Sequence, residues 1–260
     1  MKGAILARRR ALGPGLGLGL GLGLGAIPWQ LRSLAVCAST ETELESWLGE
    51  QHPEGALQVP RLVVARRQSF GHGQRGRRWQ SPAGGVWLSA ALPWPADPQQ
   101  AAAPGLAIAL ALAEALAARG AAVRLKWPND LLLQTPAGPR KLAGLLPGLR
   151  LRGPAIRWAR IGLGLNGRNP VPAGAANLRD QPGLHHGEPL ALTALALRAL
   201  ERAMALADQP EAVRLAAESL LEPPPPQWLD HTLWQPLGLA LDGGLRLVDA
   251  AGRERILRRF

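Results

Sequence analysis

The sequence predicts a mixed α/β (α+β) fold with one central mixed β-sheet flanked by helices and a small strand-rich unit at the end of the chain. Segments with strand patterns alternate with helical patterns along most of its length. A run of four prolines at 223–226 separates the last strand-like segments from the rest. The chain has 260 residues, of which 47% are hydrophobic, so it can bury a sizeable core.

Period-two alternation or continuous apolar character predicts the strands. They are expected at 31–36, 61–67, 86–92, 123–127, 131–134, 141–149 and 156–166. Helices are expected at 39–48, 105–120, 190–207 and 211–221. The first helix carries a candidate capping box from Thr40 to Glu43. The second contains Glu114 and is shorter than the ~20 residues of a membrane span, which predicts a buried core helix.

Residues 1–30 are predicted to form a disordered, low-complexity leader. A basic start is followed by a Gly-Leu repeat, and glycine forms poor helices and contributes little apolar area. No A-x-A cleavage site follows the repeat, so an export signal is not favoured. The rest of the chain is divided into a main unit at 31–222 and a small β unit at 223–260.

The net charge of the chain is +11, carried far more by arginine than by lysine. The three lysines are Lys2, Lys126 and Lys141, which draws attention to the two internal ones. A strongly cationic chain suits anionic partners. The single Cys37 excludes an internal disulfide framework and a multi-cysteine zinc site, in keeping with a reducing compartment.

The segment FGHGQRGRRW at 70–79 contains a G-x-G-x-x-G pattern, which alone is a weak signal. A dinucleotide-binding fold needs a helix directly after these glycines, but Ser-Pro and Gly-Gly follow and do not begin one. A kinase glycine loop is excluded because no H-R-D or D-F-G motif lies downstream. We therefore expect a loop between two strands that closes over an anion with its backbone amides and with Arg75, Arg77 and Arg78.

Three further motifs carry polar groups suited to a nucleotide. In KWPND at 126–130, Asp130 can hold Mg²⁺ and Asn129 can reach a phosphate or a ribose. In KLAGLL, Lys141 opens an apolar strand and Gly144 permits a close backbone approach. GLGLN ends a glycine-rich strand with an amide. Each motif alone fits an ordinary strand end, turn or packing position, but their combination in this order does not.

In this order the motifs resemble those of the biotin protein ligases, over about 31–222. The shared stretches are Ser-Thr at 39–40, Q-…-GxGxRGRxWxSPxGG at 68–85, KWPND, KLAGLL and GLGLN. The resemblance implies a mixed sheet flanked by helices and a small SH3-like β-barrel at the C-terminus. It also implies an enzyme that converts biotin and ATP into biotinyl-5′-AMP and transfers the biotin to a lysine of the biotin carboxyl carrier protein of acetyl-CoA carboxylase.

The resemblance assigns roles to the residues that match the family's motifs. The biotin-binding set comprises Ser39, Thr40, Glu41, Gln68, Gly71, His72, Gly73, Gln74, Trp79, Lys141 and Gly144. The ATP-binding set comprises Arg75, Arg77, Trp79, Lys126, Asn129, Asp130 and Asn166, with Asp130 also as the Mg²⁺ ligand. Lys141 and Arg77 are assigned to catalysis, and the lysine matches the one that touches both the biotin carboxylate and the α-phosphate.

The sequence departs from the family pattern at several points. His72 stands where the family often has arginine, and Glu41 replaces a common asparagine. Four extra residues before Lys141 are expected in a hairpin tip, and the tail after the prolines is shorter than the usual barrel. We expect no specific DNA binding because no helix-turn-helix precedes residue 31. We also expect no membrane association and a cytoplasmic location, and a homodimer is left open.

Three other interpretations remain open. A lipoate or octanoate ligase or transferase shares the fold, although its signatures do not match KWPND together with GRRWQSP. A non-enzymatic, basic nucleic-acid-binding module is compatible with the charge, but the sequence has no recognised motif or stacking array. A degenerate ligase would bind biotin without turnover, in view of His72 and the short tail.

Overall fold

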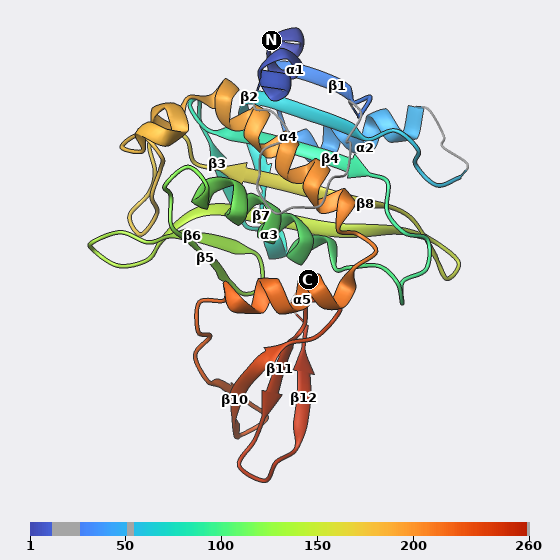
Figure 1. Cartoon of the computed structure of the whole chain (residues 1–260), viewed down its shortest axis with the longest axis vertical. Helices are drawn as coiled ribbons and strands as arrows, with labels where there is room; N and C mark the ends of the chain where they lie inside the picture. Colours follow the sequence, from blue (N-terminus) through green and yellow to red (C-terminus); the bar gives the residue numbers. More distant parts are fainter. Residues whose placement is uncertain (12–26, 51–54, 259–260) are drawn as a thin grey trace.

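The computed structural model describes residues 1–11, 27–50 and 55–258 (Figure 1). The helices are α1 (Lys2–Ala11), α2 (Thr40–Glu50), α3 (Pro104–Ala117), α4 (Pro189–Ala205) and α5 (Pro210–Ser219), with short 3₁₀ turns η1 (Gln74–Gly76) and η2 (Pro182–Gly187). The first eight strands are β1 (Gln30–Cys37), β2 (Arg61–His72), β3 (Arg78–Ser81), β4 (Val86–Leu92), β5 (Val123–Lys126), β6 (Asp130–Leu133), β7 (Arg140–Arg152) and β8 (Ala155–Leu165). The last four are β9 (Gln227–Leu229), β10 (Thr232–Leu239), β11 (Leu245–Val248) and β12 (Glu254–Leu257).

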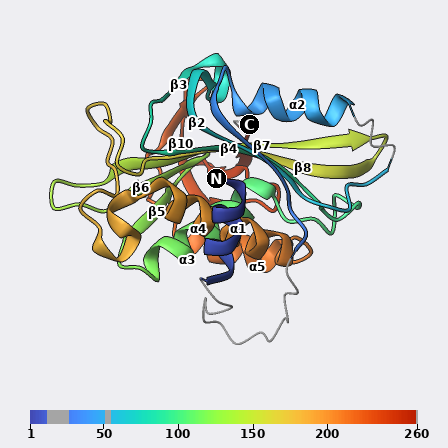
Figure 2. The same ribbon diagram turned by 90° about the horizontal axis from the view of Figure 1, so that it is seen from above.

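The main sheet has eight strands in the order β1-β2-β4-β8-β7-β6-β5, with β3 paired to β2. β1 runs parallel to β2, and the other pairings are antiparallel. Helices α3 and α4 cover one face of this sheet, with α1 beside α4, and α2 lies on the other face (Figure 2). The predicted mixed sheet flanked by helices is confirmed.

Strand β4 reads as an unbroken apolar run because both of its faces are covered, and all seven of its residues are buried. Alternate residues point to opposite faces of a strand. Leu88 and Ala90 join the large core with α3 and α4, whereas Ala91 packs in the smaller cluster with Leu44 of α2. Ser89 therefore points to the α2 face, where the functional site lies.

The predicted core helix is also confirmed, as α3 with eleven of its residues buried. Between residues 1–11, 27–50 and 55–258, no helix is long and apolar enough to cross a membrane.

The start of the chain differs from the predicted disordered leader. Helix α1 packs on the body of the protein, and its Ile5 is 1% exposed. Arg9 forms a buried ion pair with Glu201 of α4 (Nε to Oε1, 2.9 Å), and Trp29 donates from Nε1 to the same oxygen at 2.9 Å. Local composition does not reveal this contact, because the carboxylate lies on a helix far along the chain. Residues 12–26 of the expected leader lie outside the described residues.

The first turn of α2 corrects the predicted capping box. Ser39 caps the helix, because its Oγ accepts a hydrogen bond from the Glu41 amide at 3.2 Å and its carbonyl accepts one from the Glu43 amide at 3.1 Å. The Thr40 hydroxyl instead donates to Gln68 Oε1 at 3.0 Å. The box was placed one residue too late, and Thr40 is left for the functional site.

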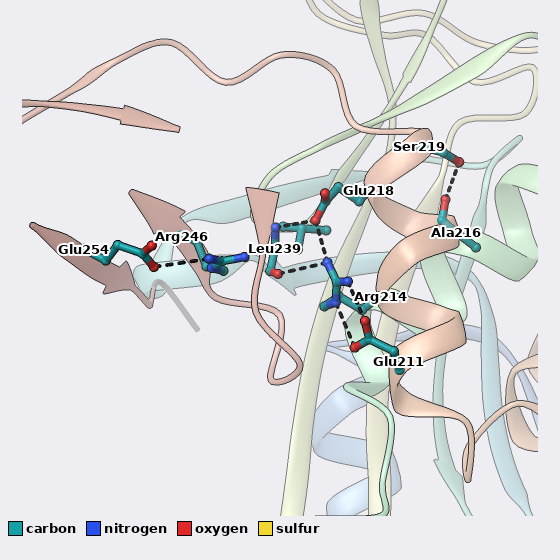
Figure 3. Close-up of polar contacts among 8 residues, drawn as sticks. All are labelled: Glu211, Arg214, Ala216, Glu218, Ser219, Leu239, Arg246 and Glu254. Atoms are coloured by element: carbon teal, nitrogen blue, oxygen red, sulfur yellow. Dashed lines mark hydrogen bonds and ion pairs between the residues drawn. The ribbon is translucent and has the colours of Figure 1, made fainter. Parts of the chain in front are cut away.

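The small C-terminal sheet is antiparallel, with the order β12-β11-β10-β9. Figure 3 shows how it is attached to α5 at Leu239. Glu218 accepts a hydrogen bond from the Leu239 amide at 2.8 Å, and Arg214 donates to the Leu239 carbonyl at 3.5 Å. Arg214 is itself held by Glu211 and Glu218 at 2.6 and 2.9 Å. The expected boundary between residues 222 and 223 lies between α5 and β9.

The buried ion pair of α1 predicts a large loss of stability when its carboxylate is removed. Glu201 is 2% exposed and also pairs with Arg198 at 3.0 Å, so Glu201→Gln leaves two partly or fully buried guanidinium groups without a counter-charge. We expect the free energy of unfolding to fall by about 3 kcal/mol in urea titrations. Glu254→Gln, which breaks an exposed pair with Arg246, should cost less than about 1 kcal/mol. Equal effects of the two substitutions would contradict a structural role for the α1 ion pair.

Candidate functional site

A cavity of about 330 Å³ lies on the main sheet, beside the N-terminal end of α2. Its walls come from the start of α2, the β2–β3 hairpin, β4, β7, β8 and the loop after β8. Of the predicted site residues, it is lined by Ser39, Thr40, Glu41, Gln68, His72, Gly73, Gln74, Arg77, Trp79, Asn129, Lys141, Gly144 and Asn166. The motifs identified in the sequence therefore meet at one place, although they are spread over more than a hundred residues.

One end of the cavity is built from neutral polar groups that hold one another. Gln68 Oε1 accepts hydrogen bonds from the Thr40 amide at 2.7 Å and from its hydroxyl at 3.0 Å. The Gln68 amide nitrogen donates to Ser81 Oγ at 2.8 Å, which fixes the orientation of its side chain. The hydroxyls of Thr40 and Ser89 lie 2.9 Å apart. Fixed donors and acceptors of this kind can bind a neutral polar group that carries both N–H and C=O.

Glu41 adds a buried carboxylate to this end. Its Oε2 accepts a hydrogen bond from Ser89 at 3.1 Å, and its Oε1 lies 2.9 Å from Nη1 of Arg160. Burial raises the pKa of the Glu41 carboxyl above its ordinary value, against the opposing effects of Arg160 and the Ser89 hydrogen bond. Arg160 is also paired with Glu45. The carboxylate is thus held in place from two directions.

Trp79 forms the wall at the other end. Its ring lies so close to Gly144 and Gly164 that a Cβ atom on these residues would meet it at 2.8 and 2.5 Å. The Lys141 ammonium lies 4.9 Å from the centre of the Trp79 ring and 2.7 Å from Asp130 Oδ1. A cation flanked by an aromatic face and a single carboxylate can also bind an anionic ligand.

The glycine loop joins β2 to β3, as predicted, and contains one 3₁₀ turn. The Gly73 amide donates to the Arg77 carbonyl at 2.7 Å, which closes the loop on itself. Arg75 adopts a left-handed conformation with φ 59°, followed by Gly76 with φ 70°. Arg77 and His72 line the cavity, whereas Arg75 is exposed and does not.

Three predicted residues besides Arg75 lie outside the cavity lining. Gly71 is buried behind it, where a Cβ would lie 2.6 Å from the Trp79 carbonyl, so its missing side chain lets β2 and β3 approach. Lys126 is exposed on the edge strand β5 and does not reach the cavity. Asp130 lies behind Lys141, to which it is paired.

The described part of the chain has no group of three or more His, Cys, Asp or Glu side chains that could hold a metal ion. Asp130 is the carboxylate closest to the Lys141 end, and its Oδ1 is buried without a hydrogen bond. Mg²⁺ commonly takes one or two carboxylates and completes its octahedron with phosphate oxygens and water. Asp130 therefore fits a Mg²⁺ ion that arrives with a triphosphate, but not a metal ion held by the protein alone.

Several site residues were missed by the sequence reasoning. Ser89 is the single hydroxyl in an apolar strand, and this was the one signal that could have revealed it. Arg160 lies on a strand that reads as core. Asn169 is 2% exposed, accepts from the Gly167 amide at 3.0 Å and donates to Asn166 Oδ1 at 3.1 Å, so it holds the predicted Asn166 in place.

Comparison with known proteins gives a consistent assignment. The family model described as "Biotin/lipoate A/B protein ligase family" matches residues 34–166, just over half of the chain. The bifunctional ligase/repressor BirA of Escherichia coli (strain K12) is 41% identical over 116 residues, which cover 43% of this chain and 34% of that protein. The biotin–[acetyl-CoA-carboxylase] ligase of Paracoccus denitrificans is 40% identical over 116 residues, 44% of this chain and 47% of that protein. The matches therefore span about a third to a half of these relatives.

Solved structures resemble the whole fold. The biotin protein ligase from Aquifex aeolicus in complex with biotin and ATP has a TM-score of 0.64 at 21% identity, over 89% of this chain and 99% of that one. The biotin acetyl coenzyme A carboxylase synthetase from Helicobacter pylori with bound biotinylated ATP has a TM-score of 0.59 at 23% identity, over 87% and 99%. These likenesses extend the shared fold beyond residues 34–166 into the C-terminal sheet. From the family match and the convergence of its motifs on one cavity, the chain belongs to the biotin/lipoate A/B protein ligase family.

Proposed function

We propose that the protein activates biotin with ATP to biotinyl-5′-AMP and transfers the biotin to a lysine of a biotin carboxyl carrier protein, that of acetyl-CoA carboxylase. The observation that carries this proposal is the joining of two different ends in one cavity: fixed neutral donors and acceptors around Thr40 and Gln68, and the cationic Lys141 beside Trp79. The names of the related ligases support the same substrates.

The neutral end favours biotin over lipoate or octanoate, which the same family also serves. A ureido ring offers one carbonyl and two N–H groups, which match the Thr40, Gln68 and Ser89 groups in kind. A dithiolane or an alkyl chain would leave these buried groups without partners, which costs about 1–3 kcal/mol for each group. Apolar residues such as Leu88 and Leu163 line the cavity beyond this end and suit the rest of the biotin molecule.

In the first step, a carboxylate oxygen of biotin attacks the α-phosphorus of ATP and pyrophosphate leaves. Lys141 stabilises this step by lying between the carboxylate and the α-phosphate, so that neither anion faces the other without a cation. Arg77 adds positive charge from the loop, and the Asn129 and Asn166 amides face the same part of the cavity. Mg²⁺ held by Asp130 would neutralise the charge of the triphosphate.

In the second step, the neutral amine of the acceptor lysine attacks the acyl carbon, AMP leaves and the amine loses a proton. The amine itself is the nucleophile, so the reaction requires no nucleophilic side chain of this chain. The acyl-adenylate is labile in water, and the loop from His72 to Arg78 is the segment placed to cover it. The cytoplasmic location, a homodimer and the absence of specific DNA binding stay predictions from the sequence.

Ligand choice tests the proposal directly. In calorimetry, the protein should bind biotin, and lipoic acid or octanoate should bind at least about 100-fold more weakly, because the paired polar groups then lose their partners. ATP added to the biotin complex should produce biotinyl-AMP and pyrophosphate. Preferential binding of lipoic acid would instead support the lipoate ligase interpretation.

Ser89 should contribute to biotin affinity, although the sequence did not single it out. Ser89→Ala removes the hydroxyl that joins Thr40 to Glu41, so two buried polar groups lose a partner. We expect the biotin Kd to rise about tenfold, with little change in the KM for ATP. Ser69→Ala, whose hydroxyl bonds to the Cys37 carbonyl away from the cavity, is the matched control. An unchanged Kd in Ser89→Ala would remove Ser89 from the binding site.

Lys141 should be needed for adenylate formation beyond its charge. Lys141→Ala should lower biotin-dependent pyrophosphate exchange by about 10²–10³-fold, the usual effect of losing one stabilising donor. Lys141→Arg should also be impaired, because the planar guanidinium cannot replace a compact ammonium between two anions. Transfer from pre-made biotinyl-AMP should suffer less, since the attack on phosphorus is already complete.

Arg124→Ala, an exposed cation on β5 outside the cavity, provides the charge-matched control and should retain exchange. Near-wild-type exchange in Lys141→Ala would mean that this lysine only terminates a strand.

A further inference from the structure

The KWPND motif contributes to two different parts of the molecule. Its Trp127 is 8% exposed and belongs to the apolar core that also includes Trp234 and Leu245 of the C-terminal sheet. Trp127 Nε1 donates a hydrogen bond to the Gly243 carbonyl at 3.0 Å. Gly243 lies in the turn between β10 and β11, so this bond joins the motif directly to the C-terminal sheet.

The residues that follow Trp127 belong to the functional site instead. The Asn129 amide nitrogen donates to the Leu145 carbonyl at 2.7 Å, and the Leu145 amide donates to the Asn129 carbonyl at 2.8 Å. Asp130 is paired with Lys141 at 2.7 Å. A segment of four residues is therefore fixed at one end by the C-terminal turn and at the other end by β7, beside the catalytic lysine.

The turn is itself firmly held. The Gly243 amide donates to the Ala240 carbonyl at 2.9 Å, and the Ala240 amide donates to the Gly244 carbonyl at 2.8 Å. Ala240 directly follows Leu239, whose amide and carbonyl are bound by Glu218 and Arg214 of α5 (Figure 3). The position of the Gly243 carbonyl is therefore set by α5 and the C-terminal sheet together.

We propose that Trp127 is a positioning residue through which the C-terminal sheet sets the geometry of the nucleotide side of the cavity. The bond to Gly243 fixes the start of the segment that carries Asn129 and Asp130. Through Asp130, the same segment places the ammonium of Lys141. The neutral end around Gln68 is built from other elements and does not depend on this bond. This inference rests on the proposed function, because it assigns the affected step to ATP.

The test compares Trp127→Phe with Trp234→Phe. Both tryptophans are 8% exposed and lie in the same apolar core, and both substitutions keep an aromatic ring while removing the indole N–H. Trp234 Nε1 is buried and makes no hydrogen bond among the described residues, so its loss breaks no such link. Trp234→Phe thus reports the cost of the smaller ring alone.

Biotin-dependent pyrophosphate exchange is measured over a range of ATP concentrations, and biotin affinity by calorimetry. Trp127→Phe should lower kcat/KM for ATP about tenfold, as expected for one lost hydrogen bond to a group that must be held in place. Its biotin Kd should stay within about twofold of the wild-type value, whereas Trp234→Phe should leave the ATP parameters unchanged. Equal ATP parameters in the two variants would overturn the inference.

Amide hydrogen exchange of the peptide over 127–133 separates this inference from the proposed function. Exchange should be faster in Trp127→Phe than in Trp234→Phe, whether or not the protein is active. If the wild-type protein shows no biotin-dependent pyrophosphate exchange, the proposed function fails, and the amide exchange still decides whether the turn controls the segment. Equal protection in both variants would show that Trp127 only fills the core.

Discussion

The functional site depends on the close approach of Trp79 to two glycines that face each other across β7 and β8. Gly144 pairs with Gly164 in the strand register, and a Cβ on either residue would collide with the indole ring. Because this space is open, the β2–β3 hairpin can fold back over the sheet and lay Trp79 flat on it. The ring then forms a wall beside which Lys141 can stand. Larger residues at either glycine would displace the hairpin and open the cavity.

The charges of the cavity are separated along the same sheet. At one end, the Glu41–Arg160 pair supports a set of neutral hydrogen-bonding groups; at the other end, Asp130 neutralises Lys141. A buried or partly buried cation without a partner is costly, so pairing with Asp130 allows Lys141 to be held ready in the free protein. In the proposed reaction, the arriving anions take over this role. The cationic character of the chain as a whole is therefore less informative than the placement of one ammonium group.

The two ends of the chain also contribute to this arrangement. Helix α1 is held against α4 by the Arg9–Glu201 pair, on the face of the sheet opposite α2. The C-terminal sheet is held by α5 and contacts Trp127 in the middle of a site motif. Segments that look peripheral in the sequence thus brace the sheet that carries the site.

The sequence by itself determined the mixed α/β class, the order of the elements and most of the cavity residues. Strand β4 was predicted with the bounds that it has, because a short apolar run flanked by turn residues is a local signal. The motifs around Gln68, Asn129 and Lys141 were recognisable because each combines special residues over a few positions. These signals need no knowledge of what lies across the sheet.

Only the tertiary structure decided which side chains of these elements meet. It placed Lys126 outside the cavity and turned Ser89 into it, since register and strand alternation determine the face that each residue occupies. It gave Arg9 a buried counter-charge and Trp127 a partner in the C-terminal sheet, in both cases from residues more than a hundred positions away. Contacts of this kind arise from chain folding and leave no local pattern, which is why the sequence did not reveal them.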